Sequence, residues 1–281
     1  MLTSRATAAA ALALVAIGVC VSAARVHESA KADRSLEAVL AKGAEYLGEY
    51  RNQLTYVMAT ERSKQTLVGG FALNGPVDET LASDVYFVYI PSDNVWMAVR
   101  DVEIVDDKVL KDRDDVRGLL NSGKIGAARA LKDRNARYNL GSILRNFNEP
   151  TLSLLVLDDQ HRKRFNFTKV NSRGSLVTVS FVERAQPTLI IDTGGRPAYS
   201  TGELSIDSET GRIERAKLKV TLSGGINAEL TTTYRLDGKL QMWVPSRFEE
   251  SYVLAGRRPE KITSTASYSD YSRFDVSVRI K

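Results

Sequence analysis

The sequence predicts an α+β protein that is mainly antiparallel β, with a half-open curved sheet or incomplete β-barrel of about ten strands. Two observations lead to this fold class. Apolar and polar side chains alternate along most of residues 202–281, as expected for strands with one buried and one solvated face. An N-terminal amphipathic helix precedes the strands, and a helical lid insertion interrupts them, so that both can cover the apolar face of the sheet.

The composition indicates a globular protein and argues against one class of partner. The 281 residues are 43% hydrophobic and 26% charged, with 39 Lys and Arg against 34 Asp and Glu. The basic residues are spread among acidic ones, which is typical of a solvated surface and argues against nucleic-acid binding.

Residues 1–23 have the layout of a secretory signal peptide. Arg5 precedes an uncharged apolar run over 6–21, and Val21-Ser22-Ala23 offers small residues at a cleavage position. We therefore expect export to the periplasm or outer envelope, with a single half-barrel domain over 24–281. An uncleaved membrane anchor is the alternative, because the apolar run is close to the shortest length that spans a bilayer.

The only cysteine, Cys20, lies within the predicted signal peptide. A lipoprotein signal would place a small residue before the acylated cysteine, whereas Val19 stands there, so lipidation is disfavoured. Cleavage after Ala23 would remove Cys20, and with it any disulfide or thiolate chemistry.

The first predicted element is a helix over 34–52, with Asp33 or Ser35 as its N-cap. Its apolar stripe consists of Leu36, Val39, Leu40, Ala44, Leu47 and Tyr50. Strands are expected at 54–68, 81–90 and 95–105, and turns at Gly69-Gly70, Asn74-Gly75-Pro76, 91–94 and Asp106-Asp107. The strand over 81–90 is apolar on both faces, which predicts a central position in the sheet.

Residues 112–148 break the strand pattern. Helical spacing occurs there in two pieces separated by Ser122-Gly123, and we interpret the region as the lid insertion. Strands dominate again after Pro150. They are expected at the apolar run 152–157, at 164–170, 175–183 and 188–192, in a hairpin over 203–222 that turns at 207–211, and at 226–234, 240–252, 262–268 and 274–280.

The sequence carries no catalytic or metal-binding motif. Neither His27 nor His161 has the neighbours that a zinc enzyme or a Ser-His hydrolase needs. His161 begins a basic run, 161–164, which we interpret as a solvated strand entrance, with contact to anionic lipid headgroups as the alternative. Glu61, Glu249 and Glu250 are the carboxylates in strand context, but nothing marks them as a catalytic pair. We predict no catalytic residue, no metal and no cofactor.

An acidic group raises the question of calcium. Its members are Asp101, Glu103, Asp106, Asp107, Asp112, Asp114 and Asp115. No glycine occupies the turn position that an EF-hand requires, so solvated hairpin tips are the expected explanation.

Aromatic residues on the predicted strands form the candidate ligand-binding set. Its members are Tyr56, Phe87, Trp96, Phe165, Phe167, Phe181, Trp243 and Tyr268. One interpretation is an ordinary core packed by the helix over 34–52. The other is a concave face too large for one helix, whose aromatic side chains line a cavity for an acyl chain or an apolar peptide.

The order of elements resembles the bacterial lipoprotein-carrier superfamily of the LolA/LolB type. The resemblance consists of a signal peptide, one amphipathic helix, an immediate strand (LTYVMATERSKQ) and a long meander ending in ITSTASYSDYSRFDV. It covers most of 34–281 and implies a half-open antiparallel barrel with helices as a lid over an apolar cavity for lipid chains. The chain is longer than those carriers and the insertion has no counterpart, so no site residue is carried over.

Three hypotheses for function follow. The first is an exported, non-enzymatic protein of the cell envelope that binds a lipid, a lipoprotein acyl chain or another apolar ligand in the half-barrel. The second is an envelope module with a fully packed sheet that binds a protein partner through its surface. The third is a secreted hydrolase.

Overall fold

The computed structural model describes residues 34–90, 93–111, 113, 115–121, 125–145 and 147–274. Contacts between residues divide the chain into two units, Met1–Lys31 and Ala32–Lys281, and the fold described below is that of the second unit. The predicted signal peptide, Cys20 and nearly all of the strand predicted at 274–280 lie outside the described residues.

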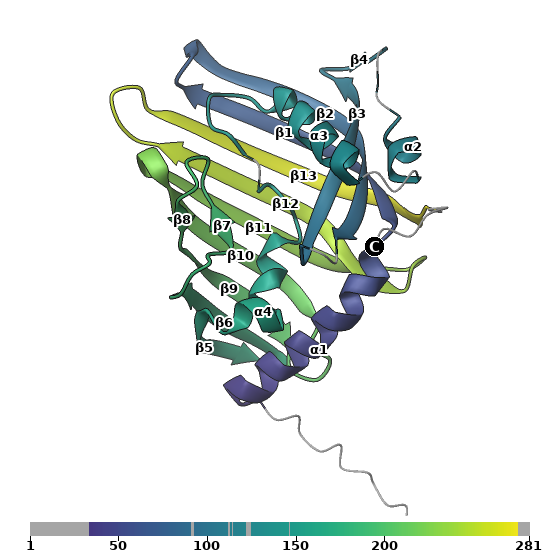
Figure 1. Ribbon diagram of the computed structural model, residues 1–281, viewed down its shortest axis with the longest axis vertical. Coiled ribbons are helices and arrows are strands. Elements are labelled where there is room, and N and C mark those ends of the chain that lie inside the picture. Colours follow the sequence, from purple (N-terminus) through teal and green to yellow (C-terminus); the bar gives the residue numbers. More distant parts are fainter. Residues whose placement is uncertain are drawn as a thin grey trace, which may run out of the picture. The chain divides into compact units, whose positions relative to one another are not determined.

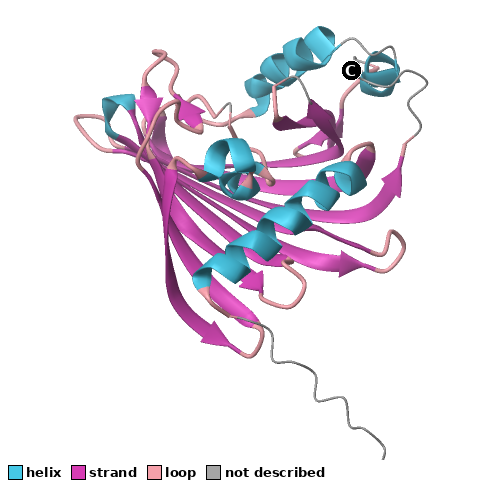
Figure 2. Ribbon diagram, turned by 60° about the horizontal axis from the view of Figure 1, so that its bottom comes forward, coloured by secondary structure: helices cyan, strands magenta, loops and turns pink. Residues whose placement is uncertain are grey.

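Eleven strands form one antiparallel sheet (Figure 1). In sheet order they are β4 (Lys108–Val109), β3 (Val95–Val105), β2 (Ala72–Ile90), β1 (Val57–Gly69), β13 (Glu260–Arg273), β12 (Met242–Leu254), β11 (Ile226–Asp237), β10 (Ile213–Leu222), β9 (Ser200–Asp207), β6 (Leu176–Glu183) and β5 (Phe165–Arg173). β1 pairs with β13, which joins the two ends of the domain's sequence. Within the described residues β4 and β5 do not pair, so the sheet is curved but open, as predicted (Figure 2).

The alternation in the sequence decides which face of the sheet is buried. On β10, Ala216, Leu218 and Val220 are buried, whereas Lys219 and Thr221 are exposed. The hairpin predicted over 203–222 is present as β9 and β10, and the strands predicted at 226–234 and 240–252 pair as β11 and β12. The C-terminal half of the fold therefore follows directly from the period of two.

Helix α1 (Leu36–Leu54) crosses the concave face of the sheet (Figure 2). Ser35 caps it, because its Oγ accepts a hydrogen bond from the Ala38 N–H at 3.3 Å. The 3-10 helix η2 (Leu152–Leu157) packs against α1 and is followed by α4 (Asp159–Arg162). A Cβ at Gly43 of α1 would lie 3.1 Å from Leu157 Cδ1, so the glycine permits this close approach.

Two hydrophobic clusters cover the two faces of β2. The larger fills the space between the concave face, α1 and η2, and includes Val85 and Phe87. The smaller includes the intervening Tyr86 and Val88. Because successive side chains enter different clusters and β2 pairs with both β1 and β3, the strand is internal and covered on both faces, as its apolar sequence predicted.

The inserted region has a helical part and a non-helical part. Helices α2 (Val116–Asn121) and α3 (Ile125–Asn135) contribute Val116, Leu120 and Leu131 to the smaller cluster, and α3 packs against β3. Most of that edge of β3 is otherwise unpaired, since β4 reaches only Ile104 and Val105. After the 3-10 helix η1 (Ala136–Tyr138), the described residues of the segment 139–148, which are 139–145 and 147–148, contact the concave face through Leu140, Ile143 and Phe147. The helices thus protect an edge, and this segment covers the concavity.

The prediction of a strand at 152–157 was wrong. These residues form η2, and residues 153–157 are all buried. A short run that is apolar on every side does not reveal whether it is a buried strand or a buried helix. His161 lies on α4, and the basic run 161–164 that it begins leads directly into β5, as expected for a strand entrance.

The turn predicted at Asn74-Gly75-Pro76 was also wrong, because these residues lie inside β2. Leu67 is opposite Val77 and Gly69 is opposite Ala72, so β2 has more residues than β1 between these two pairs. The additional residues of β2 form an irregularity in the strand, where the register shifts. Of the strand predicted at 188–192, only β7 (Ile190–Ile191) forms, paired with β8 (Pro197–Ala198) in a separate ribbon.

Asp207 organises the turn between β9 and β10. Its Oδ1 accepts hydrogen bonds from the Thr210 N–H at 2.9 Å and the Thr210 hydroxyl at 2.8 Å, and its Oδ2 accepts one from the Ser175 hydroxyl at 2.6 Å. Burial alone would raise the pKa of Asp207, but the bonds from Ser175 and Thr210 outweigh it and lower the pKa below the ordinary value of 3.8.

We predict that Asp207→Asn lowers the free energy of unfolding by about 2 kcal/mol at pH 7, because it weakens charge-assisted hydrogen bonds. A depressed carboxyl pKa stabilises the fold above pH 3.8, and this contribution is lost as the pH falls through the folded pKa. The difference between wild type and variant, measured by urea unfolding, should therefore shrink from pH 7 to pH 2. A difference that stays constant over this range would contradict the prediction.

Candidate functional site

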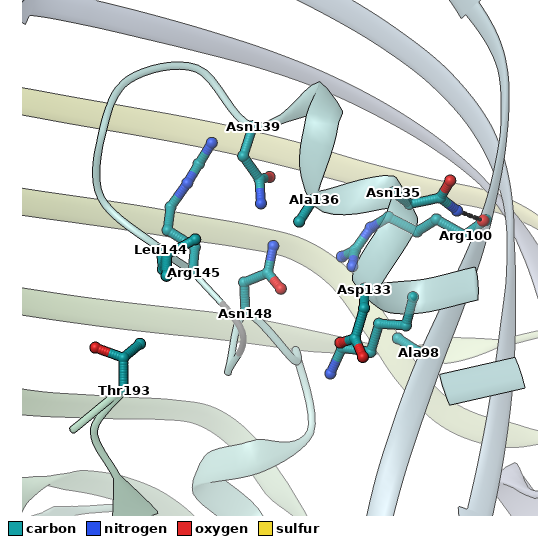
Figure 3. Close-up of a pocket in the computed structure, with 11 residues that line it drawn as sticks. Ala98, Arg100, Asp133, Asn135, Ala136, Asn139, Leu144, Arg145, Asn148 and Thr193 are labelled. Carbon is teal, nitrogen blue, oxygen red and sulfur yellow. Dashed lines mark hydrogen bonds between the residues drawn. The ribbon is translucent and has the colours of Figure 1, made fainter. Parts of the chain in front are cut away.

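The larger hydrophobic cluster leaves cavities where residues 139–148 cross the concave face. One of about 260 Å³ lies between β3, α3, η1 and this segment (Figure 3). A deeper space of about 40 Å³ continues it toward Glu61 and Gln65, and the two share Arg100, Arg145 and three asparagines. A third cavity, of about 230 Å³, adjoins the first at Leu144 and Thr193. Its apolar residues are Ile143, Leu144, Phe147, Leu222, Ile226 and Leu254.

Arg100 forms a buried ion pair at the floor of the first cavity. Its Nε and Nη2 donate to the two oxygens of Glu61 at 2.7 and 3.0 Å, and Glu61 is only 2% exposed. Burial alone would lower the pKa of Arg100, but the Glu61 carboxylate outweighs burial and holds that pKa well above its ordinary value. The guanidinium is therefore charged at any physiological pH. Both groups lie on inward-facing positions of their strands, beside Ala98 and Ala59.

Arg145 is the second buried cation, and it is less completely paired. Its side chain is 1% exposed. One Nη donates to the Gln65 carboxamide oxygen, and the other lies 4.0 Å from a Glu250 oxygen. The other oxygen of Glu250 accepts a hydrogen bond from the Tyr252 hydroxyl at 2.8 Å. Arg145 Nε has no hydrogen-bond acceptor in the described part of the chain.

The sheet anchors the segment 139–148 at several points. Gln65 of β1 donates to the Tyr138 carbonyl at 2.7 Å and accepts from the Leu140 N–H at 3.2 Å. Glu260 of β13 accepts from the Ser142 N–H at 2.8 Å and the Ser142 hydroxyl at 3.1 Å. Polar groups thus fix the backbone of the segment, and its side chains are presented to the cavities from a defined position.

Glu149 anchors the far end of the segment to β3 and α3. One of its oxygens accepts from the Ala98 N–H at 2.6 Å, and the other is bonded to the Lys132 ammonium. This carboxylate is 5% exposed and has a donor at each oxygen. Both of its oxygens are therefore engaged in contacts that hold the segment in place.

The carboxamides of Asn139 and Asn148 point toward one another across the first cavity, and the Arg100 guanidinium points into the same space (Figure 3). Neither carboxamide has a hydrogen-bond partner among the residues that the structure describes. Hydrogen-bonding groups that meet in a cavity without partners can bind a polar group of a ligand.

Seven of the eight aromatic residues predicted to line a ligand cavity are brought together, mainly as packing. Phe87, Trp96, Phe165, Phe181 and Tyr268 are buried in the larger cluster, and Phe167 and Trp243 pack against it. Tyr56 instead packs against the smaller cluster and lies edge-on to Phe274. None of the eight lines the three cavities described above, so their contact with a ligand stays a prediction.

His161 belongs to a polar network that ties α1 to α4. Its Nδ1 lies 3.2 Å from Asp158 Oδ1, and Asp158 also binds Arg51 of α1 and the Asn94 amide. Burial, followed by the charges of Arg164 and Arg51, lowers the pKa of His161 to about 4, so the imidazole is neutral at physiological pH. The network is a structural clamp between elements.

The acidic residues considered for calcium are separated by their own partners. Asp101 and Glu103 pair with Arg113, and Asp106 accepts from the Thr80 N–H at 2.9 Å. Asp112 and Asp114 lie outside the described residues. Across the ranges that the structure describes, no three His, Cys, Asp or Glu residues are grouped so that they could hold a metal ion. No helix in those ranges has the length and apolar character to cross a membrane.

Sequence reasoning missed Arg100, Arg145, Asn139 and Asn148. One signal was present in the sequence. Arg100 lies two and four residues after Ala98 and Trp96 on β3, so its side chain is on the same inward face, where an apolar residue is expected. No such signal marks the segment 139–148, because it has neither strand nor helix periodicity.

Fold and site together define an open antiparallel half-barrel with a small, partly charged cavity on its concave face.

No protein-family model matches the chain, and no curated protein matches it. Solved structures with a similar arrangement exist. One, described as an outer membrane lipoprotein-sorting protein domain from Vibrio parahaemolyticus, is 10% identical with a TM-score of 0.35, covering 83% of this chain and 93% of that chain.

Two further structures give similar values. A LolA superfamily protein from Nitrosomonas europaea is 12% identical with a TM-score of 0.30, covering 85% of this chain and 93% of that one. A DUF1329 family protein from Desulfovibrio piger is 8% identical with a TM-score of 0.33, covering 85% and 95%. A LolA superfamily protein, the type that the sequence resembles, is thus among the solved structures similar to this chain.

Proposed function

We propose that the protein is an exported, non-enzymatic protein of the cell envelope that binds a lipid or another ligand with an apolar chain. The observation that supports this best is that a cavity lined mainly by charged and amide residues adjoins, at Leu144 and Thr193, a cavity lined mainly by apolar residues. Sites for small ligands are concave and largely apolar, with a few convergent polar groups. Export is proposed from the signal-peptide pattern of residues 1–23.

The place of the ligand follows from which part of the concave face side chains already occupy. Side chains of the sheet, α1 and η2 pack continuously over much of the concave face. A ligand would therefore lie under residues 139–148, and it would meet the eight aromatic residues only by displacing part of that packing. Glu61 and Glu250, two of the three carboxylates considered for a hydrolase, are bonded to Arg100 and Tyr252, which favours the binding function over catalysis.

We predict that the purified chain from residue 24 binds the neutral apolar probe N-phenyl-1-naphthylamine, and that dodecanol displaces it. Leu144 is 62% exposed at the junction of the two cavities, so Leu144→Trp should fill the junction without disturbing the core. Probe affinity, measured by fluorescence titration, should fall about tenfold.

Val170→Trp is the matched control, since Val170 is 52% exposed on β5 and lines neither cavity. It should leave probe affinity unchanged. Native mass spectrometry with lipid extraction should find an apolar molecule on the exported protein. A clean apo mass without probe binding would overturn the proposal and favour the packed interaction module.

A further inference from the structure

The first cavity has more unused hydrogen-bond donors than unused acceptors. Arg145 is almost fully buried, yet its Nε has no acceptor and its Nη1 approaches Glu250 only to 4.0 Å. Arg100 uses Nε and Nη2 on Glu61, and its Nη1 makes no hydrogen bond within the described residues. The carboxamides of Asn139 and Asn148 add further N–H groups that face the same space (Figure 3).

The carboxylates around the cavity do not satisfy these donors. Both oxygens of Glu61 accept from Arg100, both oxygens of Glu149 have donors, and one oxygen of Glu250 accepts from Tyr252. Asp133 also lines the cavity but is exposed, so water can screen its charge. A buried guanidinium N–H without an acceptor is energetically costly, and an oxyanion is the acceptor that suits it.

The adjoining cavity limits what the oxyanion can carry. Its volume is about 230 Å³, and the apolar part of its lining, which includes Ile143, Phe147 and Leu222, suits one apolar chain. The polar part of the lining consists of Ser142, Asp192, Thr193 and Ser223. The two cavities meet at Leu144 and Thr193, so a head bound at Arg145 and a chain bound beside Phe147 can belong to one molecule.

We propose that the ligand is a single-chain amphiphile with an oxyanion head, a carboxylate or a phosphate. The head binds Arg145, Arg100 Nη1 and the carboxamides of Asn139 and Asn148, and the chain lies in the apolar cavity. This inference rests on the proposed function and adds the chemical class of the head, which the binding of an apolar chain alone does not require.

The test compares ligands with the same chain and different heads. Dodecanoate, dodecyl phosphate, dodecanol and dodecyltrimethylammonium are titrated into the purified chain from residue 24 at pH 8 by calorimetry. One or both anions should bind at least tenfold more tightly than dodecanol, and the cation more weakly than dodecanol. Which anion binds more tightly identifies the head as carboxylate or phosphate. Octanoate should bind more weakly than dodecanoate, by roughly fourfold for each methylene that the apolar cavity holds.

Variants then locate the head. Asn139→Leu and Asn148→Leu remove donors without leaving a buried charge, and each should reduce the preference for the anion over dodecanol about tenfold while dodecanol affinity is retained. Arg145→Gln should abolish the preference, with thermal unfolding by circular dichroism confirming that the variant is folded. Asn171→Leu, an exposed change on β5, is the matched control and should alter neither affinity.

The possible outcomes show whether this inference fails alone or together with the proposed function. If dodecanol binds as tightly as both anions, the assignment of the head is overturned while binding of an apolar chain stands. If none of the four ligands binds, both are overturned. An anion preference that survives all three cavity variants would also overturn the assignment, because the anion would then bind elsewhere.

Discussion

Replacing Arg100 with methionine is expected to lower the free energy of unfolding by about 3–5 kcal/mol, since removing one partner of a buried ion pair leaves an uncompensated charge. The charge left behind is that of Glu61, which is 2% exposed and would lose hydrogen bonds to both of its oxygens. Methionine fills a similar volume, so the decrease in the free energy of unfolding arises from the lost ion pair and not from a large void. Urea unfolding followed by circular dichroism measures it.

Two further variants show whether the loss has this cause. Arg247→Met breaks an ion pair with Glu249 in which both side chains are about half exposed, and it should cost less than about 1 kcal/mol. The double variant Arg100→Met, Glu61→Leu removes both charges and should recover much of the stability that the single variant loses. If Arg100→Met costs no more than Arg247→Met, the pair is not the buried element described above.

The sequence predicted those parts of the fold in which the local pattern of a single strand is enough to assign burial. Alternation along β10 placed Leu218 inside and Lys219 outside without knowledge of any other strand. The run over 81–90 implied a strand covered on both faces, and the two clusters that meet β2 cover it. In each case the local period and the burial agree because the backbone of a strand fixes both.

What the sequence did not predict depends on contacts between distant residues. The run 152–157 became η2 because α1 and the sheet bury it on all sides, and its sequence is equally suited to a strand. The cavity requires Arg100 and Arg145 from two separate segments, with Asn139 and Asn148 brought opposite one another by the anchors at Gln65 and Glu260. No pattern of spacing along the chain encodes such a meeting.

One question that the sequence left open is whether the aromatic set fills the concave face or lines a space, and Phe181 is the residue that decides it. It is 1% exposed and edge-on to Phe165, with ring centroids 5.6 Å apart. The opposite residue on β9 is Gly202, where an added Cβ would lie 2.5 Å from the Phe181 ring, so the ring occupies the room that a side chain there would need. Its surroundings are packed, and little can move in to replace it.

We therefore expect Phe181→Ala to lower the free energy of unfolding by about 3–5 kcal/mol, the range for emptying a packed core site. Phe71→Ala makes the same chemical change at a position that is 72% exposed, and it should cost less than about 0.5 kcal/mol. If Phe181 instead lined a space that a ligand occupies, alanine would cost little in the apo protein and would change ligand affinity. Urea unfolding of both variants, with and without dodecanoate, therefore distinguishes a filled concave face from a lined one.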